Sequence, residues 1–353
     1  MSDLAAHPEG LAPTAVSKVW IMLGLGVSLV LLVLVASSVG TSEVGPKTVA
    51  MCLLGLIQPE WSPPPDLAKV VFDLRLPRVF LALVAGMGLA MSGVAVQGVL
   101  MNPLVSPFIL GVAPGAAFGA ALAMVLGVDL VGFGHYLVVG NAFVTATLAM
   151  FLAYGIAQVR RSSRETIILA GIAVGYIFSA LVSILKYIST VDTLHNLVFW
   201  LMGSLWGASF QSVLFIAPLL LACLVALLWL SWDLNIMSAG DEVANSLGVR
   251  VKLVRVSVLL LSTLTTAAVI SFTGVIGFVG LVSPHMARMM VGADHRWLFP
   301  AACLVGALLL LGADTLGRVV LWPVEVPVGI TTALIGGPFF IYLLWRRNRD
   351  WWQ

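Results

Sequence analysis

Polar side chains that could do chemistry are rare in this chain, and they lie near the ends of long apolar runs. A proton relay would need carboxylates or imidazoles deep inside membrane helices. The candidates lie near predicted helix ends and are Asp129, His135, Asp192, His195, Asp314 and Glu325. Capping or interfacial positions explain them at least as well, so ion coupling is disfavoured but stays open. Without an HExxH or GxSxG motif, we expect no catalytic residue and no enzyme.

Phosphate-binding and metal-binding patterns are also missing from the sequence. None of the five lysines follows a glycine, so there is no Walker A loop for ATP. The cysteines Cys52, Cys223 and Cys303 lack CxxC spacing. We interpret them as packing residues and expect no metal or cofactor in this chain. If the protein is a pump, its energy must come from another subunit or from an ion gradient.

A polar island of 20 residues lies between two long apolar runs. Ser238 or Asp241 could cap a short helix there, and Gly248 could supply a left-handed stop. Val243 and Leu247 lie four residues apart and would form one small apolar face on this helix. An amphipathic helix held at a membrane surface needs a partner to cover such a face.

The chain that positions these residues has the composition of a polytopic membrane protein, with 60% hydrophobic and 10% charged residues among 353. The apolar runs are continuous rather than alternating, which argues against a β-barrel. They predict an all-α fold of about ten transmembrane helices. The expected spans are 19–39, 78–100, 107–127, 137–159, 166–188, 212–232, 254–272, 275–291, 298–317 and 328–345.

The basic residues orient these spans. With a cytoplasmic N-terminus, 12 of the 18 Lys and Arg residues lie inside and six outside, in agreement with the positive-inside rule. The permease domain would cover 19–345, between cytoplasmic tails at 1–18 and 346–353. Segment 40–77 would be an ordered or semi-rigid external loop rather than a domain, because it is too short for a core of its own. The polar island, 233–252, would lie in the cytoplasm.

Three arginines lie at the external ends of predicted spans. Arg75 and Arg78 open the second span, and Arg318 follows Asp314 by four residues. They could anchor the chain at the interface, with Arg318 and Asp314 as an i,i+4 pair. Alternatively, they form a basic surface for an acidic soluble partner. Gln97, in the second span, could make a helix–helix hydrogen bond or line a pathway.

The order of several motifs resembles that of FecCD-type permeases, the membrane subunits of type II ABC importers for iron–siderophore, haem and cobalamin uptake. The resemblance covers about 70–345. The motifs include Arg75-Leu-Pro-Arg78, Asn102-Pro103-Leu104, Gly240-Asp241-Glu242, Pro284-His285 and Ala313-Asp314. It implies a BtuC-like fold with ten helices, and either a homodimer or a pair with a paralogue.

The same resemblance implies the partners. Two separate ATPase subunits would bind ATP and Mg²⁺, and an extracytoplasmic binding protein would deliver the cargo. The protein would lie in the cytoplasmic (inner) membrane of a prokaryote, with both termini in the cytoplasm. No nucleic-acid partner is expected. Iron–siderophore is the default cargo, haem, cobalamin and molybdate stay open, and an ion-gradient-driven secondary transporter is the competing class.

The resemblance also assigns roles to residues. The ATPase-coupling residues would be Gly240, Asp241, Glu242, Val243, Ala244, Leu247 and Gly248. Arg75, Arg78 and Arg318 would dock the binding protein. Ser162 and Ser163 would lie at the cytoplasmic gate.

Overall fold

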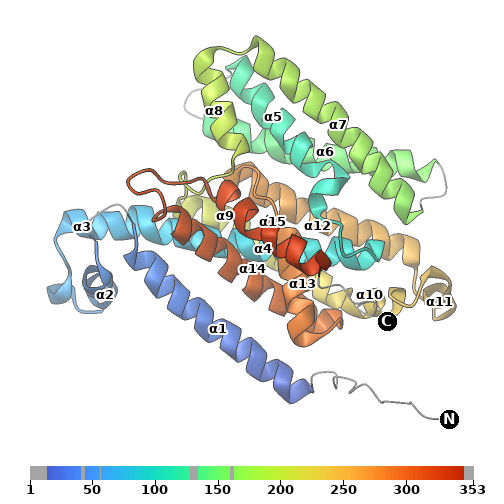
Figure 1. Ribbon diagram of the computed structural model, residues 1–353, viewed down its shortest axis with the longest axis horizontal. Helices are drawn as coiled ribbons and strands as arrows, with labels where there is room; N and C mark the ends of the chain where they lie inside the picture. Colours follow the sequence, from blue (N-terminus) through green and yellow to red (C-terminus); the bar gives the residue numbers. More distant parts are fainter. Residues whose placement is uncertain (1–13, 41–43, 56, 128–133, 160–162, 346–353) are drawn as a thin grey trace.

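The protein is helical throughout the described chain in a computed structural model, which describes residues 14–40, 44–55, 57–127, 134–159 and 163–345 (Figure 1). Each of the ten predicted spans corresponds to one helix, so the all-α prediction is confirmed. These helices are α1 (Ala15–Ser38), α4 (Leu76–Leu100), α5 (Val112–Leu126), α6 (Gly134–Gln158), α7 (Arg164–Ile188), α9 (Phe210–Trp229), α12 (Val251–Thr273), α13 (Val279–Val291), α14 (His295–Gly317) and α15 (Val328–Trp345).

Seven helices in the described ranges are long and apolar enough to cross a membrane. They are α1, α4 with the helical segment before it, α6, α7, α9, α12 and α14. The apolar helices α5 and α15 are shorter, and α13 has 13 residues. A helix needs about 20 residues to span a bilayer alone, so the short helices depend on their neighbours.

Helix α4 forms the centre of the bundle. It packs against α9, α12, α13 and α14, and most of its side chains are buried. Helix α1 lies on the outside of this group, mainly against α14. Helices α5, α6 and α7 pack on one another as a second layer, which meets the first mainly through α12 (Figure 1).

Glycines in α4 allow its backbone to lie in contact with the backbones of two neighbouring helices, α13 and α14. A Cβ on Gly86 would lie 2.4 Å from the carbonyl oxygen of Gly306 in α14. A Cβ on Gly93 would lie 1.9 Å from the carbonyl oxygen of Gly280 in α13. Small residues at such crossings are the usual way in which membrane helices pack closely.

The predicted external loop, 40–77, has more structure than expected. It contains α2 (Pro46–Gly55), the 3-10 turn η1 (Pro59–Trp61), α3 (Pro65–Lys69) and the π-helical turn η2 (Val70–Arg75), which continues into α4. Val44, Val49, Cys52 and Val71 form a small buried core there. The prediction that this segment is too short for a core was wrong, because its helical turns bring apolar side chains together.

Three further helices lie outside the ten expected spans. Helix α8 (Val191–Leu201) is amphipathic, and Leu197 is its buried residue. Helices α10 (Ser231–Met237) and α11 (Asp241–Ser246) form the polar island. They lie at the opposite end of the bundle from α2 and α3 (Figure 1). The predicted orientation therefore makes the α11 end cytoplasmic and the α2–α3 end external.

Candidate functional site

Helix α11 is a short element bounded by glycines with positive φ. Gly240 has φ of 110° and Gly248 has φ of 87°, values that favour glycine. Gly248 ends the helix as predicted, and the Val249 N–H donates to the Ala244 carbonyl at 3.0 Å in a Schellman-type turn. The predicted side-chain cap was wrong. Gly240 occupies the cap position, and no side chain hydrogen-bonds there.

Asp241 is the first residue of α11 and binds two arginines from other helices. Its Oδ1 accepts a hydrogen bond from Nη2 of Arg164, the first residue of α7. Its Oδ2 accepts one from Nη2 of Arg255 in α12 at 2.5 Å. Burial would raise the pKa of Asp241, but the hydrogen bonds from Arg255 and Arg164 outweigh it and lower that pKa. Asp241 therefore ties α11 to α7 and α12 as an ionised carboxylate.

Helix α10 is held to the start of α14 through Asn235. The Asn235 Nδ2 donates to Asp294 Oδ1 at 2.8 Å, and the Asn235 Oδ1 accepts from the His295 backbone N–H at 2.9 Å. Asp294 caps α14, and hydrogen bonds from Arg296 lower its pKa despite partial burial. The Arg296 guanidinium also lies 4.0 Å from the ring centre of Trp232 in α10. We call Arg164, Asn235, Asp241, Arg255, Asp294 and His295 the cytoplasmic cluster.

The other face of α11 is open. The side chains of Val243 and Leu247 are 45% and 65% exposed, and Glu242 is exposed beside them. Ala244 is fully buried against the bundle. The small apolar face expected from the sequence is therefore present, and the described residues leave it uncovered.

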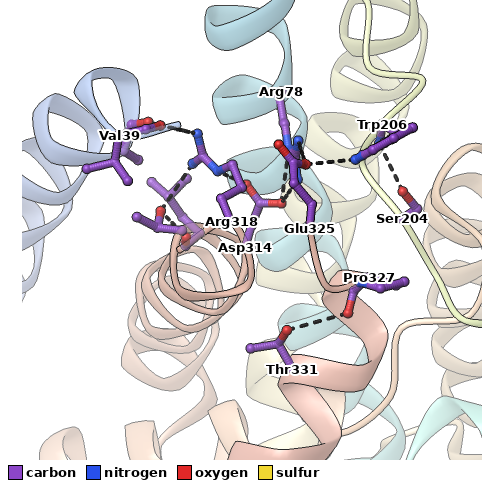
Figure 2. A network of polar contacts seen from close by, with 12 residues as sticks. Val39, Arg78, Ser204, Trp206, Asp314, Arg318, Glu325, Pro327 and Thr331 are labelled. Carbon is purple, nitrogen blue, oxygen red and sulfur yellow. Dashed lines mark hydrogen bonds and ion pairs between the residues drawn. The ribbon is translucent and has the colours of Figure 1, made fainter. Parts of the chain in front are cut away.

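A second set of polar residues lies at the other end of the bundle, which the predicted orientation makes external (Figure 2). Arg78 donates through Nε and Nη2 to Asp314 Oδ1, at 3.0 and 2.9 Å, and through Nη1 to Glu325 Oε2 at 2.6 Å. The Trp206 indole donates to the same Glu325 oxygen at 2.7 Å. Asp314 Oδ2 lies 3.2 Å from Arg318 Nε, which confirms the expected i,i+4 pair. Burial works against the charge on Glu325, yet Arg78 keeps its pKa below the usual value.

Arg75 and Arg318 cap the end of α1. Arg318 Nη1 donates to the carbonyl oxygens of Ala36 and Val39 at 3.0 and 2.8 Å. Arg75 Nη1 donates to that of Ser37 at 2.9 Å. The two residues are 5% and 3% exposed, respectively. The expectation that both are presented on an exposed basic surface was wrong, because the last carbonyls of a helix lack partners within it and arginine supplies them.

A cavity of about 300 Å³ adjoins these residues. Its walls include Gly40, Val70, Leu74, Ala208, the three arginines, Trp206 and Glu325. We call Arg75, Arg78, Trp206, Asp314, Arg318 and Glu325 the external cluster. Arg78 retains access to its surroundings, with 14% of its side chain exposed.

The model of the FecCD transport family matches residues 28–346, which include both clusters. The chain belongs to the FecCD transport family. The hemin transport system permease protein HmuU of Yersinia pestis is 38% identical over 330 residues, covering 92% of this chain and 96% of that protein. The molybdate import system permease protein MolB of Haemophilus influenzae is 42% identical over 282 residues, covering 80% and 82%.

Solved structures share the fold of this chain. A structure of a metal-chelate type ABC transporter in an inward-facing conformation superposes with a TM-score of 0.81 at 36% identity, covering 93% of this chain and 99% of that chain. PsaBC from Streptococcus pneumoniae, at 18% identity and a TM-score of 0.55, shares the fold. As a FecCD-family member, the chain is a multi-pass permease subunit of an ABC transporter and not an enzyme.

The expected gate residue Ser163 and the expected pathway residue Gln97 of this FecCD-family chain each make a hydrogen bond within the helical bundle. Ser163 caps α7, with its Oγ accepting from the Thr166 N–H at 3.2 Å, and Ser162 lies outside the described residues. Gln97 is 1% exposed, and its Nε2 donates to the Leu281 carbonyl oxygen in α13 at 3.4 Å. This contact agrees with the helix–helix interpretation. A side chain buried between two helices of one subunit is out of reach of cargo in this conformation.

Those of the remaining polar candidates that the structure describes do not assemble into a site. Asp129 lies outside the described residues. Asp192 is exposed in the first turn of α8, and the His195 ring lies tilted against that of Phe199, with ring centres 4.6 Å apart. In the described ranges, no three His, Cys, Asp or Glu side chains could together hold a metal. The three cysteines are free and buried, as packing residues would be.

Sequence reasoning missed the partners of the polar island. Arg164 lies 77 positions and Arg255 14 positions from Asp241. Asp294 lies 59 positions from Asn235. Residues so far apart in the chain leave no local sequence pattern from which such pairs could be predicted. The available signal was weaker, namely that arginines and an acid all fall at predicted cytoplasmic helix ends.

Proposed function

We propose that this permease subunit passes a metal chelate from an extracytoplasmic binding protein into the cytoplasm, driven by two ATPase subunits. Those subunits bind ATP and Mg²⁺, and a second copy of this chain completes the pathway in the cytoplasmic membrane of a prokaryote. Transport follows alternating access, in which the pathway opens to one side at a time. The observation that supports this proposal best is the uncovered face of α11.

The ATPase contact is proposed on that face. Val243 and Leu247 supply apolar area that an isolated helix in water would not favour, and Glu242 adds a charge at its edge. Gly240 and Gly248 provide the sharp turns that make α11 protrude as a separate element. The chain lacks a Walker A loop, so an ATPase seated here would supply the energy.

The binding protein is proposed to dock at the external cluster through Arg78. This arginine is the most accessible of the three and lines the adjoining cavity. Arg75 and Arg318 line the same cavity but are held by α1 carbonyls. In this proposal they shape the docking site and hold α1, and an acidic group on the partner meets Arg78.

An iron–siderophore chelate is proposed as the cargo. Related permeases are named for different cargoes: hemin, molybdate, Fe(3+)-citrate and cobalamin. Three relatives are named for Fe(3+)-citrate, iron(3+)-hydroxamate and Fe(3+) dicitrate, which favours iron, and haem, cobalamin and molybdate are the alternatives. The external histidine His195 offers no metal site with neighbouring described residues.

Purification of the tagged subunit from native membranes tests the proposed ATPase contact. We expect a subunit with a Walker A motif to co-purify, and Leu247→Asp to abolish its retention, because a carboxylate would replace the centre of the apolar face. Val16→Asp is the matched control. Val16 is also exposed, lies in the first turn of α1, and is far from α11 in the chain. Full retention of the ATPase by Leu247→Asp would contradict the proposal.

A further inference from the structure

The two sides of α11 carry different residues. Val243 and Leu247 face outward, whereas the Asp241 carboxylate is taken up by Arg164 and Arg255 on the inner side. An ATPase seated on the outer face would press on α11 without needing to touch this carboxylate. Although 36% of the Asp241 side chain is exposed, both of its carboxylate oxygens are engaged by arginines of this chain, which gives Asp241 a role besides surface contact.

The glycines at both ends of α11 indicate that this role is to hold α11 in place relative to the bundle. Gly240 and Gly248 adopt positive φ, and such positions absorb backbone rotation readily. An element of six residues between two such joints would tilt independently of the bundle unless side chains tied it down. The buried methyl of Ala244 provides packing but little directional hold. The ion pairs of Asp241 provide a direct link.

The Asp241 carboxylate links α11 to two helices, because each of its oxygens binds an arginine of a different helix. Oδ1 binds Arg164, at the start of α7, and Oδ2 binds Arg255, in the second turn of α12. The Arg255 side chain is 8% exposed and the Arg164 side chain is 22% exposed. The buried partner makes the α12 contact the more costly one to break, because a buried guanidinium needs an anion. The α7 contact is the more accessible one and lies beside Ser163, which caps the same helix.

We infer that Asp241 is a positioning residue that transmits movement of α11 to the start of α7, while Arg255 anchors it to α12. The inference rests on the proposed function, since it assumes that an ATPase moves α11. Displacement of α11 pulls on Arg164 through a charged contact, and α7 moves as a rigid helix from its first turn. The first turn of α7, which begins at Arg164, is thereby shifted with each ATPase cycle.

A thiol reporter in the first turn of α7 tests this transmission without knowledge of the cargo. Glu165 is exposed and follows Arg164, so Glu165→Cys is labelled with a maleimide in the purified complete transporter, with and without ATP and vanadate. The three natural cysteines are buried. We expect the labelling rate of the Glu165→Cys parent to change several-fold when the ATPases are trapped by vanadate.

Adding Asp241→Asn should remove this change while the ATPase still co-purifies and hydrolyses ATP. Asp241→Glu should restore part of it, and Arg164→Gln should act like Asp241→Asn without a further loss in the double variant. Glu60→Gln, which removes an exposed external carboxylate, is the control and should change nothing. If Asp241→Asn does not fold, Arg164→Gln tests the same contact and leaves the Arg255 pair intact.

The possible outcomes distinguish a failure of the inference about Asp241 from a failure of the proposed function. A labelling change that persists in both Asp241→Asn and Arg164→Gln would overturn the inference and leave the proposed function standing. Loss of ATPase retention by Asp241→Asn would also overturn it, since Asp241 would then be a docking residue. Absence of any co-purifying ATPase with the Glu165→Cys parent would instead contradict the proposed function.

Discussion

The external and cytoplasmic clusters both join distant helices through arginine–carboxylate pairs, yet they differ in exposure. The Asp314 side chain is 1% exposed, whereas that of Asp241 is 36% exposed. Charge pairs that are shielded from water interact more strongly, and losing one partner leaves a buried charge. The external cluster is thus built to hold its helices in one arrangement, while the cytoplasmic cluster can exchange its contacts with water.

The two clusters also differ in whether the helices that they join belong to one layer of the bundle or to two. The external cluster connects α1, α4 and α14, which belong to one layer of the bundle. The cytoplasmic cluster connects α11 to α7, in the second layer, and to α12, which contacts both layers. An arrangement that is fixed at one end and adjustable between layers at the other suits the alternating access proposed above. The predictions below test this difference.

The largest effect should come from Asp314→Asn. Arg78 and Arg318 would lose a shared carboxylate in a buried setting, which typically costs about 3–5 kcal/mol. We expect a much lower yield and a lower thermal midpoint in detergent. Asp192→Asn, which removes an exposed carboxylate in α8, should leave both unchanged. Equal thermal midpoints for Asp314→Asn and the parent would show that the external cluster is not a fixed anchor.

A smaller and more local effect should follow from Arg318→Ala. The carbonyls of Ala36 and Val39 would lose the donor atom that they share, Nη1 of Arg318, and a hydrogen bond to a charged group is worth about 1.5–3 kcal/mol. Hydrogen exchange measured by mass spectrometry should accelerate in the last turn of α1. Peptides from α11 serve as the internal control. Unchanged exchange in α1 would refute the capping role and favour a pure docking role for Arg318.

Loss of the contact between α10 and the start of α14, through Asn235, should have a still smaller effect on stability. Asn235→Ala removes the contacts to Asp294 and to the His295 backbone. Because the ionised Asp294 keeps its hydrogen bonds from Arg296, we expect each loss to cost only about 1 kcal/mol, as for an ordinary hydrogen bond. We expect faster hydrogen exchange in α10 and little change in the global thermal midpoint. A drop as large as that of Asp314→Asn would mean that the cytoplasmic end is as rigid as the external one.

The smallest effect should be that of pH on the Asp241 link. Its pKa is lowered, so the contribution of the ion pairs is fully present above the usual aspartate value of about 3.9 and is lost only as pH falls through the lowered value. Labelling of the α7 reporter should respond to ATP and vanadate equally at about pH 6 and about pH 8. A response that disappears toward pH 6 would indicate another titrating group.

Much of the fold follows from the apolar runs, because lipid requires continuous helices. The same reasoning failed for 40–77, where Val44 and Val71 meet in a small core although no apolar run joins them. It also missed α8, whose amphipathic pattern is too short and too polar for a span.

The candidate site was predictable only in part. Gly248 and the exposed pair Val243 and Leu247 could be placed because their pattern is local. The burial of Arg75 and Arg318 could not, because it depends on where α1 ends in space, nearly 40 and 280 positions away in the chain. Charge and position alone do not reveal whether an arginine faces a partner or a helix terminus.

Uptake into proteoliposomes tests the central claim most directly. The complete transporter, with its ATPase subunits, is reconstituted with ATP inside, and its binding protein is added outside with radiolabelled ferric hydroxamate, hemin, cobalamin or molybdate. We predict uptake of the iron chelate that requires internal ATP and persists when ionophores collapse proton and sodium gradients. Uptake that proceeds without ATP and disappears with the ionophores would contradict the account.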